Sequence, residues 1–407
     1  RRCWPLVDYF SSFRLDMSTN AAFKESSKIT LLQLVIGTFG WHFQKEKPIL
    51  EDFLTHLDHP YKGVRENIGH TLSSIYRSRY YEGYKDIQTL METQKAASSI
   101  GTRPYQATDE FRATIKDVFD RLDKWRQERP PGIQTPTPYT QASKTVLYWL
   151  ESTVNNYDCT TLVEFLPAPF MQQLLNMMDV KEDPELQSHA WSVFKQFPNI
   201  PHRKGEDEAL AKSLVEIGRT SSAWHQRLRT LINIQVLYFR YLFIMESSRR
   251  EYLLNSVRDM LHDTQLEVRL GAAQTISGMI RCSPVEFRDK AVTNLKDHFT
   301  QLLLNNPLPK KGRNAGPPGT PTPEQNRLVI TRHAAVLGLG SLVQAFPYAS
   351  PPPQWLPEVL ATLAMKAAND PGVVGKAVKT ILSEFRKVRQ DTWHVDLKVR
   401  TIFKLLI

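Results

Sequence analysis

Cysteine is scarce in this sequence, and the few cysteines stand far apart. Cys3, Cys159 and Cys282 are the only ones, and no C-x-x-C pair occurs. Cysteine-rich zinc modules need closely spaced ligands, so this class of site is excluded and we expect no metal. So few cysteines also favour a reducing compartment, and we expect the protein in the nucleus and the cytoplasm.

Groupings of catalytic residues are missing as well. No Ser-His-Asp or Cys-His arrangement is indicated, and His333 lies beside an apolar helix face without a second ligand one turn away. The glycines Gly338 and Gly340 follow a helical pattern rather than a strand, so close helix packing explains them better than a nucleotide-binding loop. We therefore predict that the chain is not an enzyme and that His333 is a structural histidine.

Acidic residues are outnumbered, but only moderately. The chain has 52 Lys and Arg against 42 Asp and Glu, which gives a net charge of +10. The excess is spread out, as is typical of a solvated surface, with an anionic partner as the alternative. A short basic cluster, KKGR at 310–313, lies in a Pro/Gly-rich loop and indicates either a solvated loop or a nuclear-import signal. Aromatic residues do not interleave with it, so we expect no direct nucleic-acid binding.

Alternating strand patterns, a signal peptide and a long apolar span are absent too, so we expect no membrane association. What is present has the period of a helix. Residues 109–129 place six apolar side chains on one stripe, with Asp109 as the expected N-cap. Residues 221–244 are apolar around much of their surface, which predicts a helix buried between neighbours. The predicted fold class is all-α.

Three segments of the sequence share one template. Val64, Val268 and Val374 each follow a turn containing Asp, Pro or Thr, and further apolar residues stand four and eight positions later. Arg65 and Arg269 come directly after the first two valines, whereas Gly375-Lys376 follow the third. The four-residue interval keeps one helix face on a partner helix, so we expect each valine to begin a buried seam. We expect each arginine to reach acidic or carbonyl groups of an adjoining repeat.

The turns themselves carry aspartates. Asp58, Asp263 and Asp370 stand just before the predicted helices, where a carboxylate can accept hydrogen bonds from free N–H groups, so we expect them to cap the helices. The whole pattern resembles HEAT repeats, with a weaker fourth copy at 182–197. It implies a HEAT/armadillo-like α-solenoid of antiparallel helix pairs. The alternative is three unrelated amphipathic helices with similar starts.

Longer stretches resemble one HEAT-repeat family in particular. They are LDHPYKGVREN, SSAWHQRLRTL, DTQLEVRLGAAQTISGMIRC, RHAAVLGLGSLVQAFPY and WLPEVL, and they occur in order between about residue 54 and about residue 393. Together they resemble the C-terminal part of the giant, ATP-independent proteasome activators. QLEVR (265–269) and RHAAVLGLG (332–340) are the most specific. The first residues, RRCWPLVDYF, lack an initiator Met, and we expect the chain to come from within a longer protein.

The resemblance implies a function that the composition does not indicate. Members of this family cap the 20S core proteasome and loosen its gate. They favour degradation of peptides and of unfolded or acetylated proteins, histones included, without ATP. They act in nucleus and cytoplasm, are linked to DNA damage and DNA repair, and hold inositol polyphosphates at positions that we cannot assign here. The alternative is a HEAT-solenoid module that binds acetylated histones or another nuclear partner without opening the gate.

Two departures from the family pattern concern the sites. Family members end in a tail with a penultimate Tyr that inserts into the core particle, and Leu406 stands in that place here. The resemblance also implies a bromodomain-like segment at about 200–290, but Ser283-Pro284 replace the Asn-Phe pair of animal members. An acetyl-lysine site there would need Ser283 as a weak donor and aromatic walls. The residues expected to form it are Tyr238, Tyr241, Ser283 and Phe287.

The loops complete the predicted organisation. We expect HEAT-like repeats over 1–94, linker loops with one amphipathic helix over 95–141, and HEAT-like repeats over 142–304. A disordered Pro/Gly loop is expected over 305–324, because its composition resists packing, and C-terminal HEAT-like repeats over 325–407.

Overall fold

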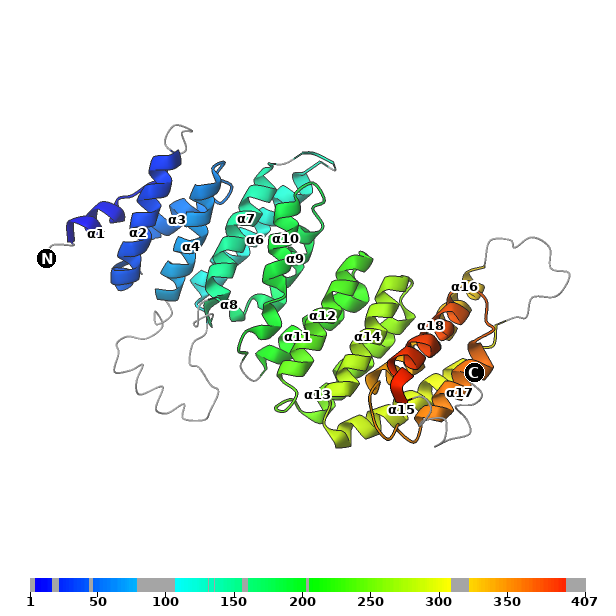
Figure 1. Ribbon diagram of the computed structural model, residues 1–407. Helices are drawn as coiled ribbons and strands as arrows, with labels where there is room; N and C mark the ends of the chain where they lie inside the picture. Colours follow the sequence, from blue (N-terminus) through cyan, green and yellow to red (C-terminus); the bar gives the residue numbers. More distant parts are fainter. Residues whose placement is uncertain are drawn as a thin grey trace. The chain divides into compact units, whose positions relative to one another are not determined.

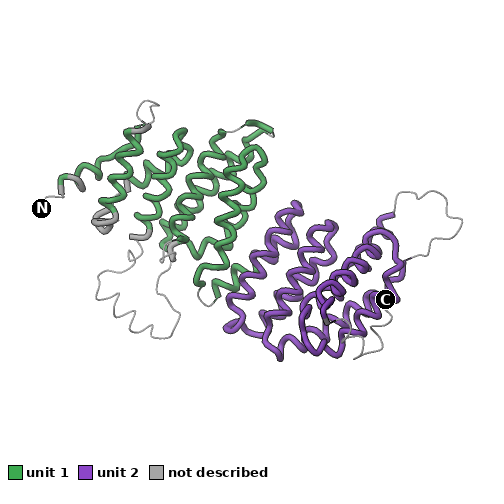
Figure 2. The backbone as a smooth tube through the Cα atoms, viewed as in Figure 1, with its two compact units in different colours: residues 1–213 green, residues 214–407 purple. Residues whose placement is uncertain are grey.

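The computed structural model describes residues 4–16, 22–43, 47–78, 107–130, 132–134, 136–155, 160–202, 205–308 and 322–392. Over these residues the regular structure is helical and contains no strand, so the all-α prediction is confirmed. The chain divides into two compact units, residues 1–213 and 214–407 (Figure 2). Each unit is described by itself below.

Unit 1 consists of helices joined by turns and longer connections. They are α1 (Trp4–Ser11), α2 (Ala22–Phe43), α3 (Lys47–Thr55), α4 (Lys62–Ser78), α6 (Asp109–Glu128), α7 (Pro138–Val154), α8 (Thr160–Val163), a π turn (Leu166–Phe170), α9 (Met171–Met178), α10 (Pro184–Phe194) and a 3-10 turn (Phe197–Asn199). Helix α11 (Glu206–Thr220) runs across the division between the units.

Neighbouring helices in unit 1 form two layers. One layer sets α2, α4, α7 and α10 side by side, and the contacts between α2, α4 and α7 are extensive (Figure 1). The other layer packs α3 on α4, α6 on α7 and α9 on α10. This is the paired-helix arrangement that the repeat template predicts.

Unit 2 repeats the same plan. Its helices are α12 (Trp224–Arg240), α13 (Ser247–Asp259), α14 (Leu266–Cys282), α15 (Val285–Asn305), α16 (Pro323–Ala345), α17 (Leu356–Ala367) and α18 (Val373–Val388), with 3-10 turns at Met260–His262 and Gln390–Thr392. The layer α12, α14, α16 and α18 is continuous, and α13, α15 and α17 pack against it (Figure 1).

Helix α6 shows how the local sequence fixes an element. Its apolar stripe is buried as the spacing predicts, through Phe111, Ile115, Val118, Phe119 and Leu122. The cap, however, is Thr108, whose side chain accepts a hydrogen bond from the Phe111 N–H, so the prediction that Asp109 caps this helix is wrong. Asp109 is the first helical residue, where its negative charge favours the positive end of the helix dipole.

Helix α16 is the core helix of unit 2. A Cβ at Gly338 would lie 2.3 Å from the Phe299 ring of α15, and one at Gly340 would lie 2.4 Å from Ile381 of α18. The prediction that these glycines serve close helix packing is therefore confirmed. By length and composition α16 could cross a membrane, but 72% of its most apolar window is buried among its neighbours, which explains the apolar character.

The segment 221–244 differs from its prediction. Helix α12 ends at Arg240, and the Tyr241 N–H closes its last turn onto the Leu237 carbonyl. The chain then leaves the helical phase, and Phe243 and Ile244 are 85% and 78% exposed. Within α12 itself, Ile232 and Phe239 lie on the outer face and are 46% and 65% exposed. The prediction of one buried helix over this segment is therefore wrong at its C-terminal end and on the outer face of α12.

The predicted loops are described only in part. Helix α7 begins at Pro138, inside the segment predicted as linker, and α16 begins at Pro323, inside the predicted Pro/Gly loop. Residues 79–106 and 309–321, with the KKGR cluster, lie outside the described residues, as do 393–407 with Leu406.

Candidate functional site

The valines of the repeat template lie at equivalent places in three helix pairs. Val64 in α4, Val268 in α14 and Val374 in α18 each lie in the first turn of their helix and have no exposed surface. The residues four positions later, Ile68, Ala272 and Val378, are buried in the same way. Each valine therefore starts the seam that holds its helix against its neighbours.

The arginines that follow the valines make the same contact twice. The Arg65 Nη1 donates to the carbonyl oxygens of His59 at 2.6 Å and Pro60 at 2.9 Å. The Arg269 Nη1 donates to those of Asp263 at 2.7 Å and Thr264 at 3.0 Å. Both guanidinium groups satisfy carbonyls of the turn before their own helix. The expectation that these arginines reach carbonyls of an adjoining repeat is therefore wrong.

Arg269 has a second contact, which does reach the next repeat. Its Nε donates to Nδ1 of His333 on α16 at 3.1 Å. His333 is 1% exposed, and its burial, together with the Arg269 charge, lowers the pKa of the imidazole to about 4. His333 is therefore a neutral acceptor in the core, which confirms its prediction as a structural histidine.

This acceptor predicts an acid sensitivity of unit 2. Because the folded pKa of His333 lies below its unfolded value, its stabilisation is complete above about pH 6.5 and is lost as the pH falls toward about 4. Between pH 7 and pH 5 the loss should be about 2 kcal/mol. We expect His333→Gln, which keeps an acceptor for Arg269, to flatten this part of the curve of unfolding free energy against pH. His262 and His298 are present in both proteins and contribute equally to both curves. Curves of the same shape for the two proteins would therefore contradict the assignment of this acid sensitivity to His333.

The turn aspartates pair with a cation from the preceding helix of the continuous layer. In unit 2, the Arg227 Nε of α12 lies 2.6 Å from Asp263, and the Arg332 Nε of α16 lies 2.5 Å from Asp370. Neither carboxylate stands at the N-cap position, which is Gln265 in α14 and Gly372 in α18. Asp263 nevertheless accepts the Gln265 N–H at 2.8 Å, so its predicted hydrogen bond to a free N–H at the helix start is present beside the ion pair. The capping role predicted for Asp370 is wrong, because its carboxylate pairs with the Arg332 guanidinium.

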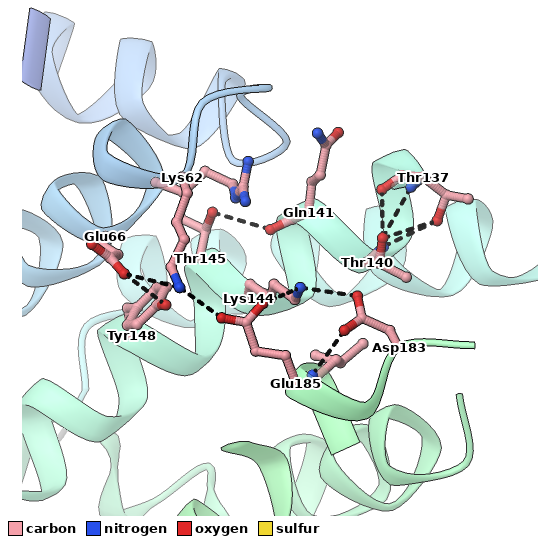
Figure 3. A network of polar contacts seen from close by, with 12 residues as sticks. Lys62, Glu66, Thr137, Thr140, Gln141, Lys144, Thr145, Tyr148, Asp183 and Glu185 are labelled. Atoms are coloured by element: carbon pink, nitrogen blue, oxygen red, sulfur yellow. Dashed lines mark hydrogen bonds and ion pairs between the residues drawn. The ribbon is translucent and has the colours of Figure 1, made fainter. Parts of the chain in front are cut away.

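Unit 1 shows the same pairing with lysine. The Lys144 Nζ of α7 lies 3.0 Å from Asp183, which also caps α10 by accepting the Leu186 N–H (Figure 3). Glu185 receives Lys144 at 2.8 Å and Lys62 of α4 at 2.7 Å, and these two hydrogen bonds lower its pKa to about 2. The network joins three helices, and Lys62 also lies 3.9 Å from Glu66, so two lysines meet three carboxylates. Among the described residues, no group of three His, Cys, Asp or Glu side chains could hold a metal.

The four residues expected to bind acetyl-lysine do not form one site. Tyr238 and Ser283 are buried, and their hydroxyl oxygens lie 2.6 Å apart. The Ser283 Oγ donates to the Met279 carbonyl at 2.7 Å, so the Tyr238 hydroxyl donates to Ser283. Both hydroxyls are used within the fold. Tyr241 is only 6% exposed, which leaves Phe287 as the accessible member.

Phe287 lines a cavity of about 370 Å³ between α13 and α15. Its ring lies under the guanidinium of Arg250, 5.9 Å from centroid to Cζ. Two carboxamides, Asn255 of α13 and Asn294 of α15, line the same cavity with Lys290. These asparagines could not be predicted from the sequence, because they come from different helices and form no spacing pattern.

Comparison with known proteins shows which sequences are similar to this chain. Residues 329–403 match the family described as "Proteasome activator complex subunit 4-like, C-terminal". Proteasome activator BLM10 of Saccharomyces cerevisiae is 24% identical over 94% of this chain and 17% of its own length. Proteasome activator complex subunit 4 of Homo sapiens is 27% identical over 95% of this chain and 20% of its own. The chain thus spans about a fifth of the length of these relatives.

A structural alignment pairs 94% of this chain with 49% of a chain from a structure of Kap95p with RanGDP, at 11% identity and a TM-score of 0.34. The fold is defined by the helix pairs themselves and not by this alignment. The matches in sequence run along nearly the whole chain, and the matched family segment begins within α16 and includes α17 and α18. Along nearly its whole length the chain is thus similar to the proteasome activators BLM10 and proteasome activator complex subunit 4, and residues 329–403 resemble the C-terminal region of that family.

Proposed function

We propose that this protein is a non-enzymatic regulator that binds the 20S core proteasome and promotes ATP-independent degradation of peptides and unfolded proteins. The supporting observation is the similarity to proteins named as proteasome activators along 94% and 95% of the chain. The geometry supports a protein that acts by contacting its partner through its surface. Buried arginines bind the turns between paired helices and so hold the helix pairs in a fixed arrangement. Scarce cysteines support action in the nucleus and cytoplasm.

Peptide hydrolysis by purified core proteasome tests this proposal. The full chain is added to the core particle, and cleavage of a fluorogenic peptide is followed alongside a native gel. We expect faster cleavage and a shifted core-particle band that contains this protein. An active-site inhibitor of the proteasome must abolish the added hydrolysis, because the regulator supplies no catalytic group. An unshifted band with unchanged cleavage would count against the proposal.

We propose acetylated proteins, histones in particular, as the finer class of partner, which also covers the alternative of a binding module without gate opening. The cavity between α13 and α15 supports this, because it combines an aromatic wall, Phe287, with the carboxamides of Asn255 and Asn294. An acetyl-lysine side chain is neutral and needs a donor for its carbonyl oxygen. A link to DNA repair follows only if this partner class holds.

Substitutions can test whether acetyl-lysine binds in the cavity at Phe287 and Asn294 or at the buried residues expected from the sequence. We expect Phe287→Ala and Asn294→Ala to weaken binding of an acetylated histone-tail peptide about tenfold, since each removes a contact worth about 1–1.5 kcal/mol. Tyr238→Phe should leave binding unchanged, because that hydroxyl is buried against Ser283. Titration by fluorescence anisotropy, with the unmodified peptide in parallel, measures this. Equal affinity for both peptides would exclude acetyl-lysine recognition here.

A further inference from the structure

A second cavity lies across the continuous helix layer of unit 2. It has a volume of about 470 Å³ and is lined by residues of α12, α14, α16 and α18. One glutamine comes from each of the first three helices: Gln235, Gln274 and Gln344. We propose that this cavity, here called the glutamine groove, binds an extended polypeptide through its main chain. The inference rests on the proposed function, for which it names the site that receives unfolded substrate.

The chemistry of the groove matches a peptide backbone. A carboxamide has both a donor and an acceptor, as a peptide group has, so each glutamine can pair with one main-chain amide whatever the side chain. Packed helices lie about 8–10 Å apart, and an extended chain advances about 3.3 Å per residue. Glutamines on successive helices therefore meet about every third residue of an extended chain.

The groove is also held in shape. Gly278 of α14 leaves room for the Gln235 side chain of α12, because a Cβ there would lie 2.6 Å from its Nε2. Arg281 of α14 donates to the carbonyl oxygens of Gln344 at 2.7 Å and Ala345 at 3.3 Å, which fixes the end of α16 at the rim. The glutamines are thus presented by elements that are tied to one another.

The charge of the groove favours a sequence-tolerant ligand. Of the described residues that line it, only Arg281 and Glu384 are charged, and their signs cancel. The cavity between α13 and α15 has more charged groups, since the cations Arg250, Arg258 and Lys290 and the carboxylates Glu251 and Glu286 line it. At the rim of the glutamine groove, Tyr348 is 78% exposed and offers apolar surface to the side chains of an unfolded segment.

The test uses a fluorescent, unstructured, neutral peptide of about nine residues, long enough to span three helices at about 3.3 Å per residue. A second peptide has the same sequence with alternate backbone nitrogens methylated, which removes main-chain donors. We expect the unmodified peptide to bind the full chain and methylation to weaken it at least tenfold. Gln274→Ala and Gln344→Ala should each weaken binding about fivefold, since each removes one net hydrogen bond.

Matched variants keep the outcome interpretable. Gln301→Ala on α15 changes an exposed glutamine outside the groove and should leave peptide binding unchanged. Gly278→Ala should weaken peptide binding as much as Gln235→Ala does, because the added methyl group displaces the Gln235 side chain. Equal affinity for the methylated and the unmodified peptide would overturn the inference. So would a Gln274→Ala/Gln344→Ala double variant that binds the unmodified peptide as tightly as the unchanged protein does. Core-particle association on a native gel without peptide is scored separately, so loss of either property identifies which proposal fails.

Discussion

Arg332→Met is expected to lower the free energy of unfolding of unit 2 by about 3–5 kcal/mol. Arg332 is 5% exposed, and its guanidinium joins three elements. Its Nη1 donates to the Leu303 carbonyl at the end of α15 at 2.7 Å, and its Nη2 donates to the Lys366 carbonyl at the end of α17 at 2.5 Å. Its Nε pairs with Asp370. Removing the charge strands a buried carboxylate and several carbonyls at once.

Hydrogen exchange resolved along the chain measures this loss, because the two units need not unfold together. Amides of α15 to α18 should exchange faster in the variant, whereas those of unit 1 should be unchanged. Arg327→Met is the matched control, since Arg327 lies on the same helix and is exposed. Asp370→Asn should have a smaller effect because the carbonyl acceptors remain. Equal protection in the Arg332 and Arg327 variants would refute the central role of this guanidinium.

Gly69→Ala is expected to destabilise unit 1 by about 3 kcal/mol or more. A Cβ at Gly69 of α4 would lie 2.8 Å from the Thr145 carbonyl oxygen and from the Trp149 nitrogen of α7, and 2.6 Å from the Tyr148 Cβ. These are mostly backbone atoms, so the helices must move apart along an extensive contact. The gain in helix propensity from Gly to Ala, about 1 kcal/mol, offsets only part of that cost.

Gly63→Ala on the same helix provides the comparison. Its Cβ would lie 3.3 Å from the Ser26 Oγ, the tip of a side chain that can rotate. Thermal unfolding followed by circular dichroism should show a lower midpoint for Gly69→Ala and little change for Gly63→Ala. If both variants unfold at the same temperature, the close approach of α4 and α7 is not what stabilises this pair.

Local patterns made part of this structure predictable. The stripe of 109–129 and the buried valines of the repeat template follow from helical spacing, which neighbours in sequence determine. The partner of Asp370 does not, because Arg332 stands on another helix and competes with the nearer N–H groups for the carboxylate. The cavity lined by Phe287 could not be predicted for the same reason, namely that its residues come from different helices. Its carboxamides come from two helices, while Tyr238 and Ser283 satisfy each other.

Three ion pairs between repeats run in the same direction along the chain. Lys144, Arg227 and Arg332 each precede the aspartate that they bind, Asp183, Asp263 and Asp370 respectively. A ribosome therefore delivers each cation before its acceptor turn is made. When the turn with the aspartate has been synthesised, it can pack at once against a helix that already carries the partner cation. The bridges thereby match the order of translation.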